Sequence, residues 1–373
     1  MKIAITLNTS WNIYNFRIGL IRELIRQGNQ ILAIAPHDDF SIKLKEEGCD
    51  FVPITMDNTG SNPFKDFSLY RQLKKIYREQ NPDIVFHYTV KPNIYGTLAA
   101  SALGIPAINN VSGLGTVFLS KSLASIAAKQ LYKRAFAKAN LVFFQNADDR
   151  QSFLSEIHLP ELPTDLLPGS GIDLSDFSVS PLPDSEHRVF LMIARLIIDK
   201  GVMEYIEAAE KTLAKYPKTK FQLLGKLDPA HARGIPEATI AKAVEDNIIE
   251  YLGETNNVKP YIKQATCVVL PSYREGTPRT MLEAAAMGRP IITSNVAGCR
   301  EVISNNETGL LCEARNATHL YEKMIEICEM TNPELATMGT KGRNLVENKF
   351  DEQIVIEQYL KHLSNIMNQI PTE

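Results

Sequence analysis

Residues 267–288 decide the fold class, and they read Cys267-Val-Val-Leu-Pro-Ser-Tyr-Arg-Glu-Gly-Thr-Pro-Arg-Thr-Met-Leu-Glu-Ala-Ala-Ala-Met-Gly288. The short apolar run at the start is typical of a buried strand in a parallel sheet. Thr277 suits the N-cap of a following helix, Pro278 its first position and Gly288 the position just past its end. The stretch therefore predicts a buried strand, a loop and then a helix over 278–287.

Two carboxylates lie eight positions apart at this junction, Glu275 on the loop and Glu283 in the second turn of the helix. A helix N-terminus offers amide groups and the positive end of the helix dipole, and both suit a phosphate. Carboxylates accept hydrogen bonds from the hydroxyl groups of sugars. We therefore expect the junction to bind a nucleotide sugar.

Strand and helix patterns alternate along all 373 residues, which predicts an α/β protein with parallel sheets. A chain of this length exceeds what one hydrophobic core usually serves, so we expect two Rossmann-like domains. The expected strands lie near 2–7, 30–35, 51–54, 83–88, 106–110, 141–146, 189–195, 221–225, 248–252, 267–271, 290–294 and 309–312. The expected helices include 16–27, 66–79, 201–215, 278–287 and 318–330.

A segment rich in Gly, Pro and Ser over 169–188 is the expected linker. It separates an N-terminal domain over 1–168 from a C-terminal, nucleotide-sugar-binding domain over 189–350. Residues 351–373 have a helical period, and we expect them to pack back on the N-terminal domain. In such a protein the ligand should lie at the carboxyl ends of the strands, where the two domains face each other.

The composition, with 44% hydrophobic and 22% charged residues, is that of an ordinary globular protein, and the net charge of −3 argues against a nucleic-acid binder. The five cysteines are scattered and lack C-x-x-C spacing, which favours buried, reduced thiols. The N-terminus begins with a strand pattern instead of a signal peptide, and no apolar run reaches about 18 residues. We therefore expect a cytoplasmic protein.

A second strand–loop–helix pattern places two cations near the glutamates. Arg195 ends the first expected strand of the C-terminal domain, and Lys200 lies in the loop that follows. The carboxyl ends of parallel strands share one edge of a sheet, so both should lie beside Glu275. A guanidinium and an ammonium group can hold a diphosphate without a metal. Because the chain contains no D-x-D motif, we expect a metal-independent reaction with no cofactor besides the nucleotide sugar.

The whole chain resembles the family 4 glycosyltransferases of the GT-B type, which have two Rossmann-like domains. The E-x7-E motif of that family falls on Glu275 and Glu283. The other matching stretches are Gly169-Ser-Gly-Ile-Asp173, Ala194-Arg-Leu-Ile-Ile-Asp-Lys-Gly201, Leu270-Pro-Ser-Tyr-Arg-Glu-Gly-Thr-Pro278 and Leu282-Glu-Ala-Ala-Ala-Met-Gly288.

The resemblance implies a retaining transfer from a nucleotide sugar, usually a UDP-sugar. It places Glu283 at the ribose hydroxyls, Glu275 at the donor sugar, and Arg195 and Lys200 at the diphosphate, where they stabilise the leaving group. No side chain is expected to be the general base, because the leaving diphosphate is thought to take that role. Further donor contacts are implied for the backbone of Gly276, Thr277, Pro278, Arg279 and Thr280, and for a base-binding segment that includes Gly253 and Val258.

The first loop departs from the family pattern, because it reads Asn8-Thr-Ser-Trp-Asn-Ile-Tyr14 where many members carry a glycine pair. We expect Asn8 to contact the donor through its side chain instead. Gly113 and Gly115, after a strand of the N-terminal domain, form either a flexible loop at the acceptor or an ordinary turn.

Three charged or titratable residues of the N-terminal domain are further candidates. His87 ends an expected strand and is either a catalytic group or a hydrogen-bonded structural histidine. Arg17 and Lys91 are candidates to hold the diphosphate of an acceptor, with ordinary surface charge as the alternative.

The segment 120–140 has a helical period and carries five basic residues and no acidic residue. A basic amphipathic helix suits docking on an anionic membrane surface. A core-packed helix with a solvated basic face is the alternative. We expect membrane docking, on the inner face of the plasma membrane.

A closer resemblance is to bacterial N-acetylgalactosaminyltransferases that build polyprenyl-diphosphate-linked glycans, and it is carried by Ile13-Tyr-Asn-Phe-Arg17, Ser61-Asn-Pro-Phe64 and Gly113-Leu-Gly115. It implies transfer of a hexose or N-acetylhexosamine from a UDP-sugar to a lipid-linked saccharide in capsule, O-antigen or glycoprotein assembly.

The alternative is a UDP-sugar 2-epimerase on the same fold, which needs no acceptor. An NAD-dependent oxidoreductase is disfavoured because neither half has G-x-G-x-x-G after its first strand. An inactive binding subunit is disfavoured because both glutamates are present.

Overall fold

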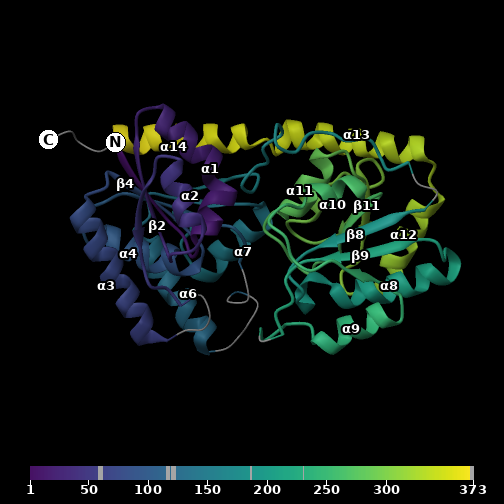
Figure 1. Ribbon diagram of the computed structural model, residues 1–373. Coiled ribbons are helices and arrows are strands. Elements are labelled where there is room, and N and C mark those ends of the chain that lie inside the picture. The colour runs from purple at the N-terminus through teal and green to yellow at the C-terminus, as the bar shows by residue number, and fades with distance from the viewer. Residues whose placement is uncertain (58–61, 115–117, 119–122, 185–186, 230, 370–373) are drawn as a thin grey trace. The chain divides into compact units, whose positions relative to one another are not determined.

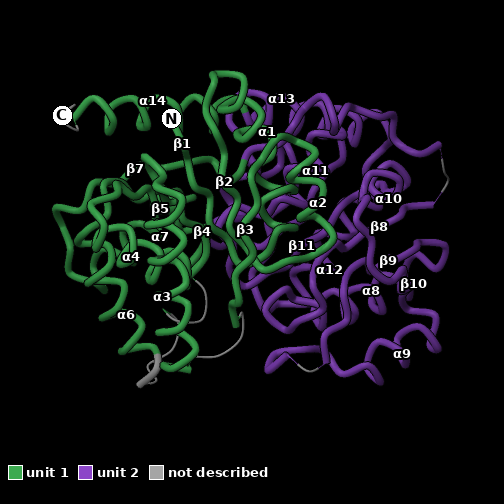
Figure 2. Tube along the Cα trace, turned by 60° about the vertical axis from the view of Figure 1, so that its left-hand side comes forward, with its two compact units in different colours: residues 1–170, 353–373 green, residues 171–352 purple. Residues whose placement is uncertain are grey.

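The computed structural model describes the chain except for residues 58–61, 115–117, 119–122, 185–186, 230 and 370–373. It forms two compact units, with residues 1–170 and 353–373 in unit 1 and residues 171–352 in unit 2 (Figures 1 and 2). Most of the expected linker lies in unit 2, because Ile172 and Phe177 are part of the hydrophobic core there.

Unit 1 contains a seven-stranded parallel sheet in the order β3-β2-β1-β4-β5-β6-β7. Its elements are β1 (Lys2–Thr6), α1 (Ser10–Arg26), β2 (Gln30–Ala35), α2 (Phe40–Glu46), β3 (Asp50–Pro53), α3 (Pro63–Gln80), β4 (Ile84–Tyr88), the π-helix η1 (Pro92–Gly96), α4 (Thr97–Ser101), β5 (Ala107–Val111), α6 (Leu123–Phe136), β6 (Leu141–Phe144), α7 (Ala147–Ile157), β7 (Thr164–Leu166) and the C-terminal α14 (Glu352–Asn368).

The C-terminal helix α14 completes the core of unit 1. Figure 1 shows it, in yellow, beside the purple α1, and residues of both helices share one hydrophobic cluster with β1 and β4. Tyr359 is its central residue, because its ring lies 5.4 Å from that of Phe86 and 4.8 Å from that of Phe143. Its hydroxyl also accepts a hydrogen bond of 3.2 Å from the side chain of Asn110.

Unit 2 contains a six-stranded parallel sheet in the order β10-β9-β8-β11-β12-β13. Its elements are β8 (Val189–Ile193), the 3-10 helix η2 (Ile198–Lys200), α8 (Val202–Lys215), β9 (Lys220–Leu224), α9 (Glu237–Glu245), β10 (Glu250–Tyr251), α10 (Lys259–Gln264), β11 (Cys267–Leu270), α11 (Arg279–Ala286), β12 (Ile291–Ser294), the 3-10 helix η3 (Arg300–Val302), β13 (Gly309–Cys312), α12 (Ala317–Glu329) and α13 (Asn332–Lys349).

The predicted α/β class with two Rossmann-like sheets is confirmed. Strand order reverses between β1 and β4 in unit 1 and between β8 and β11 in unit 2. In open parallel sheets, ligands bind beyond the carboxyl ends of the strands at such switch points. Arg195 follows β8 and Glu275 follows β11, so both lie at the switch point of unit 2.

The two chain segments that connect the units pair with each other. Ile172 donates a backbone hydrogen bond of 2.8 Å to Phe350, and Glu352 donates one of 3.1 Å back to Ile172. Gly171 has a φ of +72°, and a Cβ atom there would lie 2.4 Å from the Cα atom of Glu352. A glycine is therefore required where the chain first enters unit 2.

Local boundaries differ from the prediction in two informative places. Helix α1 begins at Ser10 instead of residue 16, because Thr9 caps it by accepting a hydrogen bond of 3.1 Å from the amide of Asn12. Helix α11 begins at Arg279, so Pro278 and not Thr277 is its N-cap residue. Among the described residues, no helix is long and apolar enough to cross a membrane.

Candidate active site

The loops after β8 and β11 are joined to each other by main-chain contacts. Tyr273 donates a backbone hydrogen bond of 2.9 Å to Asp199, and the hydroxyl of Ser272 donates one of 3.0 Å to the same carbonyl. A Cβ atom on Gly201 would lie 2.1 Å from the carbonyl oxygen of Pro271, so only glycine allows the loops to approach this closely. The backbone therefore fixes the spacing between the two loops.

This spacing brings Lys200 and Glu275 together. The Nζ atom of Lys200 donates a hydrogen bond to Oε1 of Glu275 as an ion pair. The two side chains are 22% and 13% exposed, so both are largely buried but remain accessible to solvent. A charge-assisted contact at a partly buried position is stronger than one in open solvent.

The loop after β12 packs against the backbone of Glu275. The amide of Glu275 donates a hydrogen bond of 3.3 Å to the carbonyl of Ala297 in this loop. Gly298 has a φ of +83°, and a Cβ atom there would lie 2.2 Å from the carbonyl oxygen of Glu275. The thiol of Cys299 lies close enough that the Glu275 charge adds to the effect of burial, which raises the pKa of this thiol. The loop after β12 thus positions the backbone of Glu275, while Lys200 contacts its carboxylate.

Glu283 lies in the second turn of α11 and is only 8% exposed. Arg279 donates a hydrogen bond of 3.0 Å to its Oε1 atom from one turn before. Burial raises the pKa of Glu283, and the charge of Arg279 opposes this shift. The carboxylate therefore has one oxygen engaged with Arg279 and the other available to accept hydroxyl protons near the helix N-terminus.

Arg195 is exposed at the end of β8, and within the described part of the chain its side chain makes no hydrogen bond or ion pair. The backbone around it is held closely, because a Cβ atom on Gly225 would lie 1.7 Å from the carbonyl oxygen of Ala194. An exposed guanidinium at the carboxyl end of β8, with no counter-ion among the described residues, is suited to an anion.

The expected base-binding residues follow β10, at the edge of the same sheet. Gly253 accepts a backbone hydrogen bond of 2.7 Å from the amide of Gly225, and the side-chain hydroxyl of Tyr251 donates a hydrogen bond of 3.0 Å to the Gly225 carbonyl. No atom lies within 4 Å of the position of a Cβ on Gly253, so its outer side is open. Val258 is partly buried and is the N-cap residue of α10.

His87 lies at the end of β4 but has no exposed surface. Its Nε2 atom is 2.9 Å from the hydroxyl of Tyr77, and its Nδ1 atom is 3.0 Å from Oδ1 of Asn109. Burial lowers the pKa of His87 to about 3. A Cβ atom on Gly96 would lie 2.4 Å from its ring, which closes the remaining side. These contacts favour the structural interpretation over the catalytic one.

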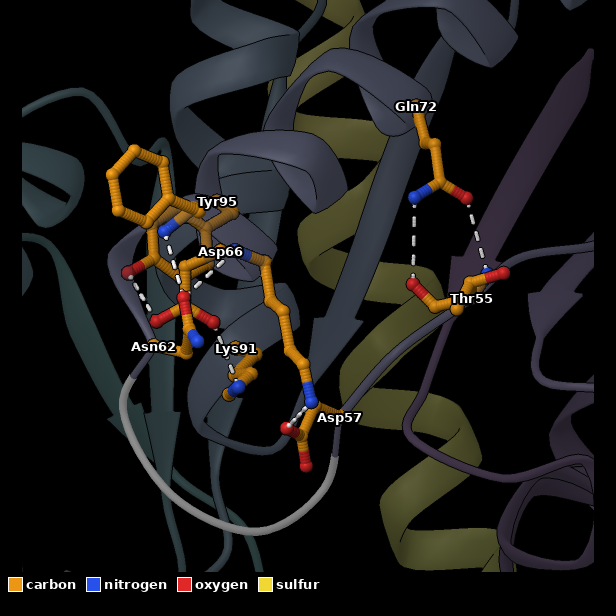
Figure 3. Close-up of polar contacts among 9 residues, drawn as sticks. Thr55, Asp57, Asn62, Asp66, Gln72, Lys91 and Tyr95 are labelled. Atoms are coloured by element: carbon orange, nitrogen blue, oxygen red, sulfur yellow. Dashed lines mark hydrogen bonds and ion pairs between the residues drawn. The ribbon is translucent and has the colours of Figure 1, made fainter.

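Arg17 and Lys91 have very different surroundings. Arg17 on α1 is 6% exposed, and its guanidinium lies 4.3 Å from the ring centre of Tyr88. It donates a hydrogen bond of 3.2 Å to the carbonyl of Phe16, and its buried Nε atom has no hydrogen-bond partner in the described part of the chain. Lys91 instead forms an ion pair of 2.7 Å with the buried carboxylate of Asp66 (Figure 3). Lys91 is neutralised, whereas no carboxylate contacts Arg17 among the described residues.

The remaining candidates of unit 1 are less informative. Asn8 follows β1, and its side-chain oxygen accepts a hydrogen bond of 2.8 Å from Asn12, which holds it at the start of α1. Gly113 has a φ of +142° in the loop after β5. Gly115 lies outside the described residues.

Three features of the site were not anticipated from the sequence. Gly298 lies close to the backbone of Glu275, and Gly225 lies close to the backbone of Ala194. No local sequence motif indicates either contact. The ion pair between Arg279 and Glu283 was detectable, because opposite charges four positions apart on a helix commonly meet. Asp66 was also missed as the counter-ion of Lys91, since the two are 25 positions apart.

Comparisons with known proteins support the same assignment for both halves. Residues 2–146 match the family model described as glycosyl transferase 4-like, and residues 175–345 match that of glycosyl transferases group 1. Over 99% of this chain and 100% of the relative, the chain is 28% identical to the N,N'-diacetylbacillosaminyl-diphospho-undecaprenol alpha-1,3-N-acetylgalactosaminyltransferase of Campylobacter jejuni. It is 24% identical to the UDP-Gal:alpha-D-GlcNAc-diphosphoundecaprenol alpha-1,3-galactosyltransferase of Escherichia coli, over 89% of this chain and 91% of that one.

Solved structures share the fold at low sequence identity. Sucrose-phosphate synthase from Thermosynechococcus elongatus superimposes with a TM-score of 0.82 at 18% identity, covering 99% of this chain and all of the other. The Anabaena protein Alr3699/HepE, in complex with UDP and glucose, gives a TM-score of 0.80 at 18% identity and covers 98% of this chain and all of its own.

The fold and both family matches therefore define a glycosyltransferase with two Rossmann-like domains. More particularly, the chain is related to the family 4 enzymes of the GT-B type, as its E-x7-E motif predicts.

Proposed function

We propose that the protein transfers a hexose or N-acetylhexosamine from a UDP-sugar to a polyprenyl-diphosphate-linked saccharide during surface-glycan assembly, with retention of anomeric configuration. The observation that carries the proposal is the Lys200–Glu275 ion pair at the switch point of unit 2. Arg195 follows β8 at the same switch point, and its side chain has no partner among the described residues. The names of the C. jejuni and E. coli relatives, both acting on diphospho-undecaprenol-linked sugars, support the class of acceptor.

In this proposal the donor lies along the carboxyl edge of the unit 2 sheet. Glu283 accepts hydrogen bonds from the ribose hydroxyls, and the base lies against Gly253 and Val258. The N-terminus of α11, where Pro278 offers no side-chain cap, faces the phosphates with its first amides. Glu275 contacts hydroxyl groups of the sugar that is transferred.

Arg195 and Lys200 stabilise the charge that develops on the β-phosphate as the bond to the sugar breaks. Arg195 has no ion pair with a described residue that would have to be broken first. Lys200 is already oriented by its hydrogen bond to Glu275, so little conformational entropy is lost when it binds the diphosphate. Stabilisation of the leaving group by fixed charges is the main catalytic effect in this scheme. We propose that the positive charge comes from these side chains and that no metal is required.

The acceptor diphosphate is assigned to Arg17 in preference to Lys91. Burying an unpaired guanidinium is costly, and a bound anion would compensate it. Arg17 has no carboxylate partner in the described chain, whereas Asp66 already neutralises Lys91.

Membrane docking through segment 120–140 on the inner face of the plasma membrane is part of the same proposal. Within the described portion, α6 packs inward with Tyr132 and Phe136, while Arg134 is exposed. Lys129 forms an ion pair of 2.9 Å with Glu156, so fewer of its charges are available than the sequence suggests.

The experiment is a screen of UDP- and GDP-sugars by ligand-observed NMR, followed by transfer assays with a short-prenyl diphosphate saccharide. We expect UDP release that depends on the acceptor and a product with the anomeric configuration of the donor. A matched reaction without acceptor tests the 2-epimerase alternative. Formation of an epimer from the donor alone, without transfer, would overturn the proposed function.

A further inference from the structure

Helix α3 has a side that none of the described elements of unit 1 covers. Its buried positions recur every three or four residues and define the side that packs on the core. The opposite side, which we call the α3 outer face, consists of Phe64, Phe67, Arg71, Lys74, Lys75 and Arg78. These positions are also spaced by three or four residues, so their side chains lie along one stripe.

The rotation of α3 is fixed by its first turn. The carboxylate of Asp66 accepts hydrogen bonds of 2.7 Å from Lys91 and 3.1 Å from Tyr95 (Figure 3). Asn62 caps the helix by accepting a hydrogen bond of 3.0 Å from the amide of Phe64. Because Asp66 is anchored inward, the neighbouring Phe64 and Phe67 point away from the core.

The two phenylalanines are unusually exposed. Phe64 is 88% exposed and Phe67 is 60% exposed, and among the large apolar side chains that the structure describes none exceeds Phe64. Tyr70, one turn further, stacks on Phe67 with 6.2 Å between ring centres. Adjacent aromatic side chains in water are unfavourable unless another surface covers them.

The rest of the stripe is cationic. Arg71, Lys74, Lys75 and Arg78 face outward with Glu79 as the nearby acid, and that contact with Lys75 is long, at 3.7 Å. Lys65 is not included among these cations, because it forms an ion pair of 2.9 Å with Asp57. The face thus combines aromatic rings at one end with a row of cations along the helix.

We propose that the α3 outer face docks unit 1 on an anionic lipid bilayer, with Phe64 and Phe67 inserted below the headgroups and the basic side chains over them. The charge pattern complements an anionic surface, and aromatic residues favour the membrane interface. The inference rests on the proposed lipid-linked acceptor, which brings the enzyme to a membrane, and it adds a membrane contact through residues outside segment 120–140.

Sedimentation with vesicles tests the proposal. Wild-type protein should bind phosphatidylcholine vesicles that contain phosphatidylglycerol and bind pure phosphatidylcholine much more weakly. The double variant Phe64→Ser/Phe67→Ser should lose at least about tenfold in partitioning, since two rings no longer insert. Ile42→Ser, at a residue of α2 that is 60% exposed, is the matched control and should bind like wild type.

A charge variant tests the basic stripe. Arg71→Gln/Lys74→Gln/Arg78→Gln should lose about fivefold per charge and should respond less to salt. Three exposed lysines of unit 2, changed as Lys242→Gln/Lys263→Gln/Lys349→Gln, give the matched control, which should bind like wild type. Circular dichroism should be unchanged in every variant, because all the substituted side chains lie outside the core.

The outcomes separate this inference from the proposed function. Vesicle binding that is unaffected by the phenylalanine variant, or lost only in a Lys133→Glu/Arg134→Glu/Lys138→Glu variant of the 120–140 segment, would overturn the α3 proposal. With a water-soluble short-prenyl acceptor, the phenylalanine variant should transfer sugar at the wild-type rate. Absence of transfer by wild type would reject the proposed function, while the vesicle assay would still decide the docking surface.

Discussion

The ammonium group of Lys200 contacts the carboxylate of Glu275, although the two residues are 75 positions apart in the sequence. They follow neighbouring strands whose loops are hydrogen-bonded to each other, so the contact is a property of the sheet order. The proposed catalytic charges are therefore placed by the loops that follow the two central strands of the unit 2 sheet.

The first prediction concerns this ion pair. Lys200→Ala should lower kcat/KM by about tenfold to a hundredfold, as expected for a lost charge-assisted bond of about 1.5–3 kcal/mol. Glu275→Gln should mainly lower kcat. Because the side chains touch, the double variant should lose less than the product of the single losses. Lys226→Ala, at an exposed lysine after β9, is the control. If the loss of kcat/KM in the double variant equals the product of the two single losses, the two side chains act independently.

The second prediction concerns the pH dependence of nucleotide binding. Glu283 must be ionised to accept ribose hydroxyls, and burial raises its pKa while Arg279 opposes the rise. Arg279→Met should therefore raise this pKa further, so that UDP affinity is lost at a higher pH as the solution is acidified. Calorimetric titrations with UDP between pH 5 and pH 8 measure the shift. Glu283→Gln should bind UDP weakly with little dependence on pH, and a steep profile in that variant would contradict the assignment.

The third prediction separates the two cations of unit 1. Arg17→Met should raise KM for the lipid-linked acceptor at least tenfold and leave KM for the donor unchanged, since it removes one charged contact to the acceptor. Lys91→Met should instead lower the melting temperature, because it leaves the buried Asp66 without its counter-ion. Steady-state kinetics and thermal denaturation distinguish the two effects. Equal acceptor KM values in both variants would remove Arg17 from the acceptor site.

The fourth prediction concerns acid stability. Burial lowers the pKa of His87 to about 3, whereas the unfolded chain protonates histidine near about 6.5. The unfolded state therefore binds the extra proton first, and folding stability falls as the pH drops from about 6.5 towards 3. The loss should reach about 2 kcal/mol by pH 5. His87→Gln should flatten this dependence, which denaturation at several pH values will measure. An unchanged slope would mean that other groups dominate.

The fifth prediction tests the support beneath Glu275. Gly298→Ala combines a positive φ with a Cβ atom 2.2 Å from the Glu275 carbonyl, so the loop must shift. We expect a stability loss of about 1–3 kcal/mol together with reduced turnover. Gly104→Ala, at another glycine of positive φ but with open space around it, is the control for backbone strain alone. It should lose stability without losing turnover per folded molecule.

Local patterns predicted much of the fold and the centre of the site. The apolar run before Pro271 predicted the bounds of β11 to within one residue. Pro278 and Gly288 predicted the start and the end of α11 with the same accuracy. The spacing of the two glutamates placed one on a loop and the other in the second helical turn. The placement of Arg195 and Lys200 followed from their position after a strand, because the carboxyl ends of parallel strands share one edge of the sheet. Their chemical role stays a prediction.

Other features could not be predicted because they depend on contacts that are distant in the sequence. His87 looked like a catalytic candidate until Tyr77, Asn109 and Gly96 were found to enclose it. The neutralisation of Lys91 by Asp66 likewise requires the tertiary fold. Sequence position identifies the edge of a sheet, but it does not tell which side chains there face solvent.

The helix α14 imposes an order on biosynthesis. Tyr359 and its neighbours supply part of the core of unit 1, yet they are translated after the whole of unit 2. As the chain leaves the ribosome, unit 2 is a continuous segment that can finish folding at once. Unit 1 is synthesised first and completed last, so a nascent chain that stalls before residue 353 exposes the apolar surface that α14 covers. Such a truncated product lacks part of the core of its own first half.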